Sequence, residues 1–125
     1  MSKTIALRAE LKRVLKTLTG HVYGEKAPEK APYPHAVFEL SEVLSSDGKT
    51  IFQFEVNIID YGLSETAAET LSDTIQEAFN KYSFINAEIQ FTSYKGLRQT
   101  IKEDDHRIIR RRLLFEIQLH ELKGE

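Results

Sequence analysis

The sequence contains no cysteine, no tryptophan and no long apolar run. Without cysteine, its 125 residues can form neither a disulfide framework nor a thiolate metal site, and they offer no cysteine nucleophile. No stretch approaches the roughly 20 apolar residues that cross a bilayer, and the start Met1–Ile5 lacks the hydrophobic core of a signal peptide. We therefore expect a protein that neither spans a membrane nor is exported through a signal peptide.

Neither sign of charge is in excess. Lys and Arg together number 17 and Asp and Glu number 19, which gives a formal net charge of −2. With 29% charged and 41% hydrophobic residues, the composition is ordinary for a globular domain, and we expect residues 1–125 to form one domain. The overall charge does not favour a dedicated nucleic-acid-binding protein.

Recognisable catalytic and metal-binding patterns are missing as well. The 4 histidines are too far apart in the sequence to show the short spacing at which two of them hold one metal ion. The densest titratable group, Asp104-Asp105-His106, is interpreted as a solvated turn. No serine lies in a nucleophile elbow, and no glycine spacing matches a phosphate-binding loop. We predict no catalytic residues, no metal site and no cofactor.

What the sequence does contain is a clear strand pattern between Ala31 and Asp60. It opens with Ala31-Pro32-Tyr33-Pro34-His35 and continues with two stretches, His35–Leu44 and Ile51–Ile59, in which every second residue is apolar. Ser46-Asp47-Gly48-Lys49 lies between them and has turn-forming residues. The pattern predicts two half-buried antiparallel strands joined by a tight turn.

Two helices and two further strands are predicted around this hairpin. Apolar residues recur at helical spacing from Thr4 to Leu18 and from Ala67 to Tyr82, and alternation predicts strands near Ala87–Tyr94 and Arg107–Glu121. The order α-β-β-α-β-β predicts an α+β two-layer sandwich, with a four-stranded, mainly antiparallel sheet and both helices on one face. Five phenylalanines are expected in the core: Phe52, Phe54, Phe79, Phe91 and Phe115.

Two segments offer surfaces for other molecules. Gly24–Pro34 holds all 3 prolines without apolar periodicity, and it is expected to form an exposed loop. The long final strand is expected to extend beyond its partners and to leave backbone groups with which another subunit can pair.

The strongest local charge pattern is Glu103-Asp104-Asp105 followed by four arginines: Arg107, Arg110, Arg111 and Arg112. Strand alternation predicts Arg110 and Arg112 on the face opposite Arg111. Two interpretations remain open. The arginines either pair across strands with acidic neighbours such as Glu55 or Glu88, or they bind carboxylates of a second subunit or phosphates of passing DNA.

In order and spacing, these pieces resemble the tail terminator proteins of tailed bacteriophages, also called tail completion, head–tail joining or minor capsid proteins, of siphophages and prophages. The likeness covers nearly the whole chain. It rests on the N-terminal helix, the loop with Val22-Tyr23-Gly24, the strands containing residues 32–38 and 52–60, the helix containing residues 65–79, and an arginine-rich final strand.

The resemblance implies a non-enzymatic, homo-hexameric ring that caps the tail tube, ends its polymerisation and joins the tail to the head. Its implied partners are further copies of itself, the tail tube protein and a head–tail connector or stopper protein, with DNA passing through the channel. Its implied location is the tail or neck of a virion assembled in the host cytoplasm. The alternatives are another neck or head-completion protein and a small ligand-binding or regulatory α+β module.

We assign the hypothetical subunit or partner interface to six residues of the arginine cluster and the start of the first strand: Arg107, Arg110, Arg111, Arg112, Tyr33 and His35. Guanidinium groups bind carboxylates and phosphates through paired hydrogen bonds, which makes them suited to either kind of contact.

Overall fold

The computed structural model describes residues 3–121 and contains two helices and six strands. In chain order the elements are α1 (Lys3–Leu18), β1 (Val22–Gly24), β2 (His35–Ser46), β3 (Lys49–Tyr61), α2 (Thr66–Phe79), β4 (Tyr82–Ile85), β5 (Ile89–Ile101) and β6 (Ile108–Glu121). The six strands form one sheet in the order β1-β2-β3-β6-β5-β4. The sheet is mixed, because β1 runs parallel to β2 while every other neighbouring pair is antiparallel.

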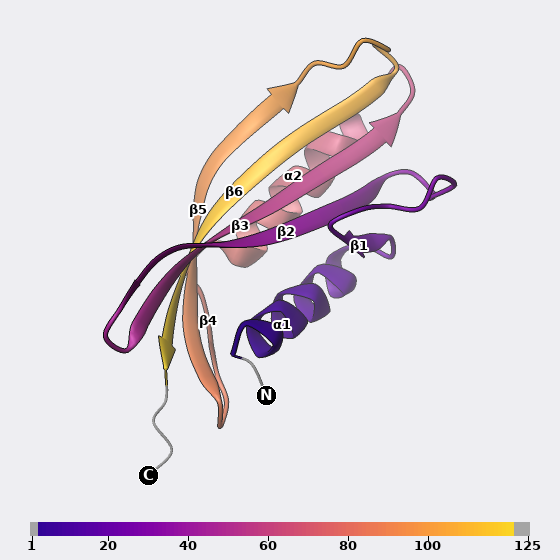
Figure 1. Ribbon diagram of the computed structural model, residues 1–125. Coiled ribbons are helices and arrows are strands. Elements are labelled where there is room, and N and C mark those ends of the chain that lie inside the picture. Colours follow the sequence, from indigo (N-terminus) through magenta and orange to yellow (C-terminus); the bar gives the residue numbers. More distant parts are fainter. Residues whose placement is uncertain (1–2, 122–125) are drawn as a thin grey trace.

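The sheet is strongly curled and forms a half-barrel whose concave side holds the helices (Figure 1). We call this the helix side, and the opposite face the convex face. Phe54 of β3 lies at the centre of the core, with its ring centroid 5.2 Å from that of Phe79 on α2 and 5.7 Å from that of Phe115 on β6. Each such ring contributes about 1.5–3 kcal/mol when fully buried. All five phenylalanines predicted for the core are buried.

The predicted four-stranded, mainly antiparallel two-layer sandwich is wrong, because the sheet has six strands, is mixed and is curled. Two short strands account for the different strand count. β1 has 3 residues and β4 has 4, which is too short for the alternation that identifies a strand in a sequence.

The second helix also ends earlier than its apolar spacing predicts. α2 ends at Phe79, and Lys81 then adopts a left-handed backbone conformation with φ 62°, so that Tyr82 belongs to β4. Tyr82 still packs on the core, with its ring centroid 6.2 Å from that of Phe79 and 5.9 Å from that of Phe91. Tyr82 therefore lies at helical spacing from the apolar residues of α2, although it reaches the core from a strand.

The predicted hairpin is present, and its two strands pair as far as Ser46 and Lys49, with Gly48 at φ 73° in the turn. The final strand differs from the expectation, because β6 lies between β3 and β5 and is paired on both sides. The expectation that the final strand extends beyond its partners and leaves backbone groups unpaired is therefore wrong. No helix within residues 3–121 is long and apolar enough to span a membrane.

Candidate partner interface

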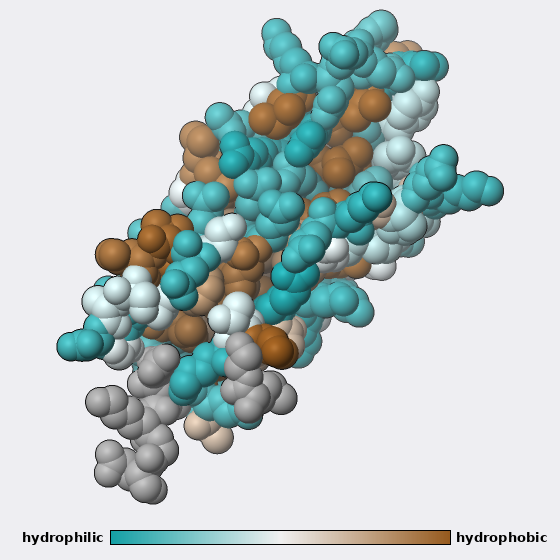
Figure 2. All heavy atoms as spheres, in the orientation of Figure 1, coloured by the Kyte–Doolittle hydropathy of each residue, from teal (hydrophilic) through white to brown (hydrophobic). Residues whose placement is uncertain are grey.

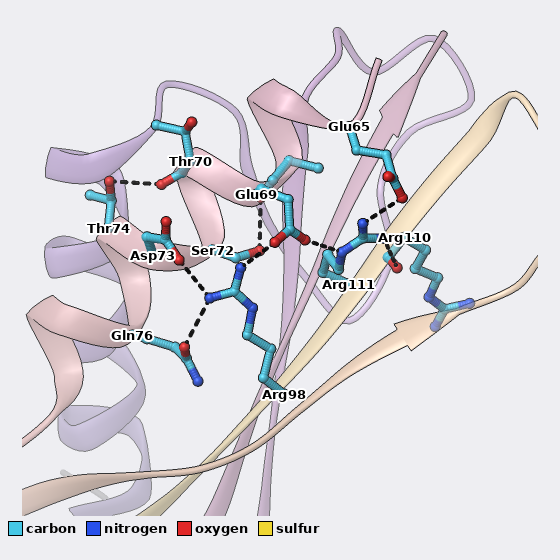
Figure 3. Close-up of polar contacts among 11 residues, drawn as sticks. Glu65, Glu69, Thr70, Ser72, Asp73, Thr74, Gln76, Arg98, Arg110 and Arg111 are labelled. Atoms are coloured by element: carbon cyan, nitrogen blue, oxygen red, sulfur yellow. Dashed lines mark hydrogen bonds and ion pairs between the residues drawn. The ribbon is translucent and has the colours of Figure 1, made fainter. Parts of the chain in front are cut away.

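The predicted arginines occupy both faces of the sheet. Arg111 points to α2 on the helix side, whereas Arg110 points away from it (Figure 3). Arg112 also lies on the convex face, where it contacts Glu55 of β3, and the predicted alternation is thereby confirmed. The pairing with Glu55 is confirmed as well, whereas Glu88 is not among the ion-pair partners found for these arginines within residues 3–121.

Arg111 is buried beneath the start of α2, with 5% of its surface exposed. Its Nε donates to a carboxylate oxygen of Glu69, its Nη2 donates to Glu65 at 2.7 Å, and its Nη1 donates to the carbonyl oxygen of Arg110 at 3.2 Å (Figure 3). Glu65 immediately precedes the helix and Glu69 lies one turn later, so both carboxylates reach the same guanidinium. All three guanidinium nitrogens thus have acceptors inside the chain.

Arg98 of β5 extends this network along the helix. It donates to Glu69 at 2.8 Å, to Asp73 at 2.6 Å and to Gln76 at 3.1 Å (Figure 3). The hydrogen bond from Arg111 lowers the pKa of Glu69 and outweighs the opposing effect of burial. The sequence prediction did not include Arg98 or these carboxylates. The carboxylates could have been found from the four-residue spacing of Glu65, Glu69 and Asp73, which places them on one side of a helix.

On the convex face the partners are different. Arg112 donates to Glu55 at 2.9 Å. Arg110 donates from Nε and Nη2 to Asn57 at 3.2 and 3.1 Å, and from Nη1 to Glu103 at 3.2 Å. Burial alone would raise the pKa of Glu55, but hydrogen bonds from Asn57 and Arg112 outweigh it, and the pKa is lowered.

Tyr33, His35 and Arg107 come together at one end of the convex face through Tyr61. The ring centroid of Tyr33 lies 5.1 Å from that of His35 and 5.9 Å from that of Tyr61, and the Arg107 guanidinium carbon lies 5.3 Å from the Tyr61 centroid. His35 is buried, and its Nδ1 lies 3.0 Å from the carbonyl oxygen of Pro32. The other three side chains are about half exposed, and we call Tyr33, Tyr61 and Arg107 the aromatic–arginine patch.

Arg107 is held in this patch by the turn before β6. Its backbone N–H donates to Asp105 at 3.0 Å and its Nε donates to the same oxygen at 3.2 Å, and the backbone hydrogen bond is the largest cause of the lowered pKa of Asp105. The N–H of Gly62 donates to the Arg107 carbonyl at 2.8 Å and ties the turn to the end of β3. Asp104 and His106 are exposed in this turn, and residues 3–121 contain no group of three or more side chains placed to hold a metal ion.

An open hollow of about 390 Å³ lies between the turn after β3 and the loop before β6. Leu63 and Ile101 are among its apolar lining residues, and Glu65 and Arg111 are among its polar ones. A ligand pocket needs polar groups that are free to orient the ligand. Here Glu65 and Arg111 bind each other, whereas Lys102 and His106 also line the hollow, so its lining does not decide the ligand-binding alternative.

No known protein-family model and no curated protein matches the sequence. Among solved structures, a chain from the "Virion of native gene transfer agent (GTA) particle" has a similar fold, with a TM-score of 0.70 and an alignment that covers 90% of each chain. The two sequences are 13% identical, so the similarity shows the fold alone. This curled α+β fold therefore also occurs in a chain of a virion particle, and the match covers most of both chains.

Proposed function

We propose that this protein is a structural, non-enzymatic component of a phage-like virion. The observation that carries the proposal is the fold similarity to a chain of a gene transfer agent virion over 90% of both chains. The resemblance of the sequence to phage tail terminators supports the same role from the order and spacing of its segments. The two arguments start from different properties of the chain, one from its three-dimensional fold and one from its sequence.

In this proposal the protein is a tail terminator. It forms a homo-hexameric ring that caps the tail tube, ends tube polymerisation and joins the tail to the head, with DNA passing through the ring. Its partners are the tail tube protein and a head–tail connector or stopper protein, and it is assembled into the tail or neck in the host cytoplasm. Another position in the neck is the alternative within the same class.

The aromatic–arginine patch is the surface that we assign to one of these partners. Tyrosine and arginine are enriched among the residues that contribute most to protein–protein affinity. Arg110 and Arg112 lie on the same convex face, and both guanidinium groups are about one-third exposed, so that a partner carboxylate can compete for them. Arg111 is assigned to holding α2 on the sheet, because its nitrogens already have acceptors.

The decisive experiment asks whether the protein is part of a particle. Phage-like particles from the source cells are purified by density gradient, and the protein is quantified by mass spectrometry against the tail tube protein. We expect a few copies per tail, and cells lacking the gene should yield unjoined heads together with tails of irregular length. Particles that lack the protein, together with normal particles from the deletion strain, would refute the virion role.

The patch is tested in the deletion strain by complementation. Tyr33→Ala combined with Arg107→Ala should leave a folded protein that no longer joins tails to heads, because the partner contact is lost. Lys16→Ala, which removes an exposed basic side chain on α1, is the control and should complement fully. Normal joining by the double variant would show that the partner binds elsewhere.

A further inference from the structure

Two stretches of the sheet have no strand partner on their outer side. β1 pairs only with residues 36–38 of β2, and β4 pairs only with residues 90–93 of β5. Within residues 3–121 this leaves residues 39–46, which we call the β2 edge, and residues 94–101, which we call the β5 edge. One N–H of the β5 edge, that of Lys95, donates to the Asn80 side chain at 3.3 Å. An open edge presents backbone groups that another strand can bind.

The two edges run in opposite directions. Each of the pairs β2–β3, β3–β6 and β6–β5 is antiparallel, so β2 and β5 are antiparallel to one another. In a ring whose axis runs along the strands, the β2 edge of one copy would meet the β5 edge of the next in the same antiparallel geometry. Such a contact uses two different surfaces of the chain, and it closes into a ring when the rotation between successive copies adds up to a full turn.

The charges on the two edges are complementary. The β2 edge carries Glu39 and Glu42 and no basic residue, whereas the β5 edge carries Lys95 and Arg98 and no acidic residue. Arg98 is already bound to Glu69 and Asp73 of α2, so the complementarity rests on Lys95. Glu42 and Lys95 are each paired in register with a core phenylalanine, so both lie on the helix side. Neither has an ion-pair partner among the side chains of residues 3–120. Pairing two β2 edges would bring like charges together, whereas pairing a β2 edge with a β5 edge brings opposite charges together.

Each edge also contains a β-bulge that exposes aliphatic side chains. Val43 and Leu44 at the bulge of the β2 edge are 64% and 62% exposed, and Leu97 at the bulge of the β5 edge is 50% exposed. A shallow groove of about 250 Å³ lies between the bulges, with Val43, Gly96 and Leu114 among its lining residues. Figure 2 shows apolar side chains gathered in clusters among charged ones on the face turned to the viewer.

We propose that copies of this chain join edge to edge, with the β2 edge of one copy antiparallel to the β5 edge of the next. Glu42 then lies beside Lys95 of the neighbouring copy on the helix side, and Val43 and Leu44 pack against its Tyr94, which is 38% exposed, on the convex face. This register follows because, in an antiparallel pair, residues that follow Glu42 meet residues that precede Lys95. The proposal rests on the proposed ring and names the surfaces that close it. It replaces β6, which is paired on both sides, as the strand through which subunits associate.

Bulges and charges at an edge also occur in monomeric proteins, where they prevent pairing with other chains. Protection of that kind places charged or polar side chains at the exposed positions. In this chain the bulges instead expose three aliphatic side chains, Val43, Leu44 and Leu97, which are costly to leave in water. The combination of open backbone, opposite charge and exposed aliphatic residues therefore favours a contact over protection.

Charge reversal tests the contact. Glu42→Lys and Lys95→Glu are made singly and together, and association is measured by sedimentation and light scattering over about a hundredfold range of concentration. Each single reversal should weaken association by about tenfold or more, and the double variant should recover most of the loss. Glu88→Lys is the matched control, because it makes the same charge change at an exposed position that precedes β5 and lies outside both edges. Thermal melting confirms that each variant is folded.

Cysteine cross-linking gives a second test, since the chain has no cysteine of its own. Val43→Cys or Leu44→Cys is combined with Tyr94→Cys, which lies next to them across the proposed contact, and oxidised. Inside one chain these strands are three spacings apart, roughly 14 Å, which is too far for a disulfide. The double variants should therefore form covalent chains of three or more copies, whereas each single variant should remain uncross-linked.

Three results would overturn the edge contact: a wild-type protein that stays monomeric throughout, covalent dimers formed by Val43→Cys or Leu44→Cys alone, or cysteine double variants that do not cross-link together with a charge-reversal double variant that does not recover association. The particle experiment tests the proposed function separately. A protein found in particles but without the edge contact would leave the virion role standing. A ring joined through these edges but absent from particles would refute the virion role and keep the contact.

Discussion

The two faces of β6 use the same type of residue in opposite ways. On the helix side the arginine is buried and its acids are exposed: the Arg111 side chain is 6% exposed, against 64% for Glu65 and 45% for Glu69. On the convex face the acid is the less exposed member, with Glu55 at 17% and Arg112 at 34%. Burial of the cation holds Arg111 between α2 and the sheet, whereas we expect the more exposed Arg112 to exchange partners more readily. Residues adjacent in the sequence therefore have different roles because a strand alternates its faces.

The largest effect is expected from reversing the buried charge. Arg111→Glu places a carboxylate in a buried site beside Glu65 and Glu69, where it has no cation of its own. We expect a loss of about 3–5 kcal/mol in the free energy of unfolding, which is typical of an uncompensated buried charge. Urea unfolding followed by circular dichroism measures it.

The control for that variant is the same change one residue earlier. Arg110→Glu reverses a charge on the convex face, where the side chain is 36% exposed. Its cost should be about 1 kcal/mol or less, because surface pairs are screened by water. Equal losses of unfolding free energy for Arg110→Glu and Arg111→Glu would show that burial of the arginine does not distinguish the two faces.

A smaller loss of stability is expected when the pH is lowered. The pKa values of Glu69 and Glu55 are both lowered from about 4.5, so each contributes stability that is present above that pH and is lost as pH falls through the lowered folded value. Glu55→Gln and Glu69→Gln should each reduce stability at pH 7 by at most about 1 kcal/mol and make the acid limb shallower. Urea unfolding at a series of pH values measures this. A wild-type protein whose stability is flat through the acid range would contradict the prediction.

Alternation predicted much of the sheet, and the places where it failed have a physical cause. The hairpin of β2 and β3, the buried phenylalanines and the extent of β6 follow from regular periods in the sequence. β5 was predicted to end near Tyr94, but it continues to Ile101. The bulge between Lys95 and Arg98 shifts the phase of alternation by one residue, so the second half of the strand no longer continues the pattern of the first.

In the candidate interface, too, features set by neighbouring residues could be predicted, whereas features set by the pairing of distant strands could not. The opposite faces of Arg110 and Arg111 follow from alternation alone. The grouping of Tyr33 with Arg107 does not, because both contact Tyr61, which the pairing of β3 with β6 brings opposite Ile108. Pairing between strands that are far apart in the sequence cannot be read from a single chain without structural information.

The smallest change in stability is expected at Ser93. It tests whether a buried hydroxyl on the helix side stabilises the protein only when it has a hydrogen-bond partner. Its hydroxyl is fully buried and has no hydrogen-bond partner among the described residues, unlike the equally buried Ser72, whose hydroxyl donates to the Ala68 carbonyl at 2.8 Å. Ser93→Ala removes an unsatisfied polar group and should raise the free energy of unfolding by up to about 1 kcal/mol, whereas Ser72→Ala should lower it by a similar amount. Thermal melts of the two variants measure the difference. If Ser93→Ala destabilised the protein as much as Ser72→Ala, the Ser93 hydroxyl would have a partner in solution, and burial without pairing would not distinguish it from Ser72.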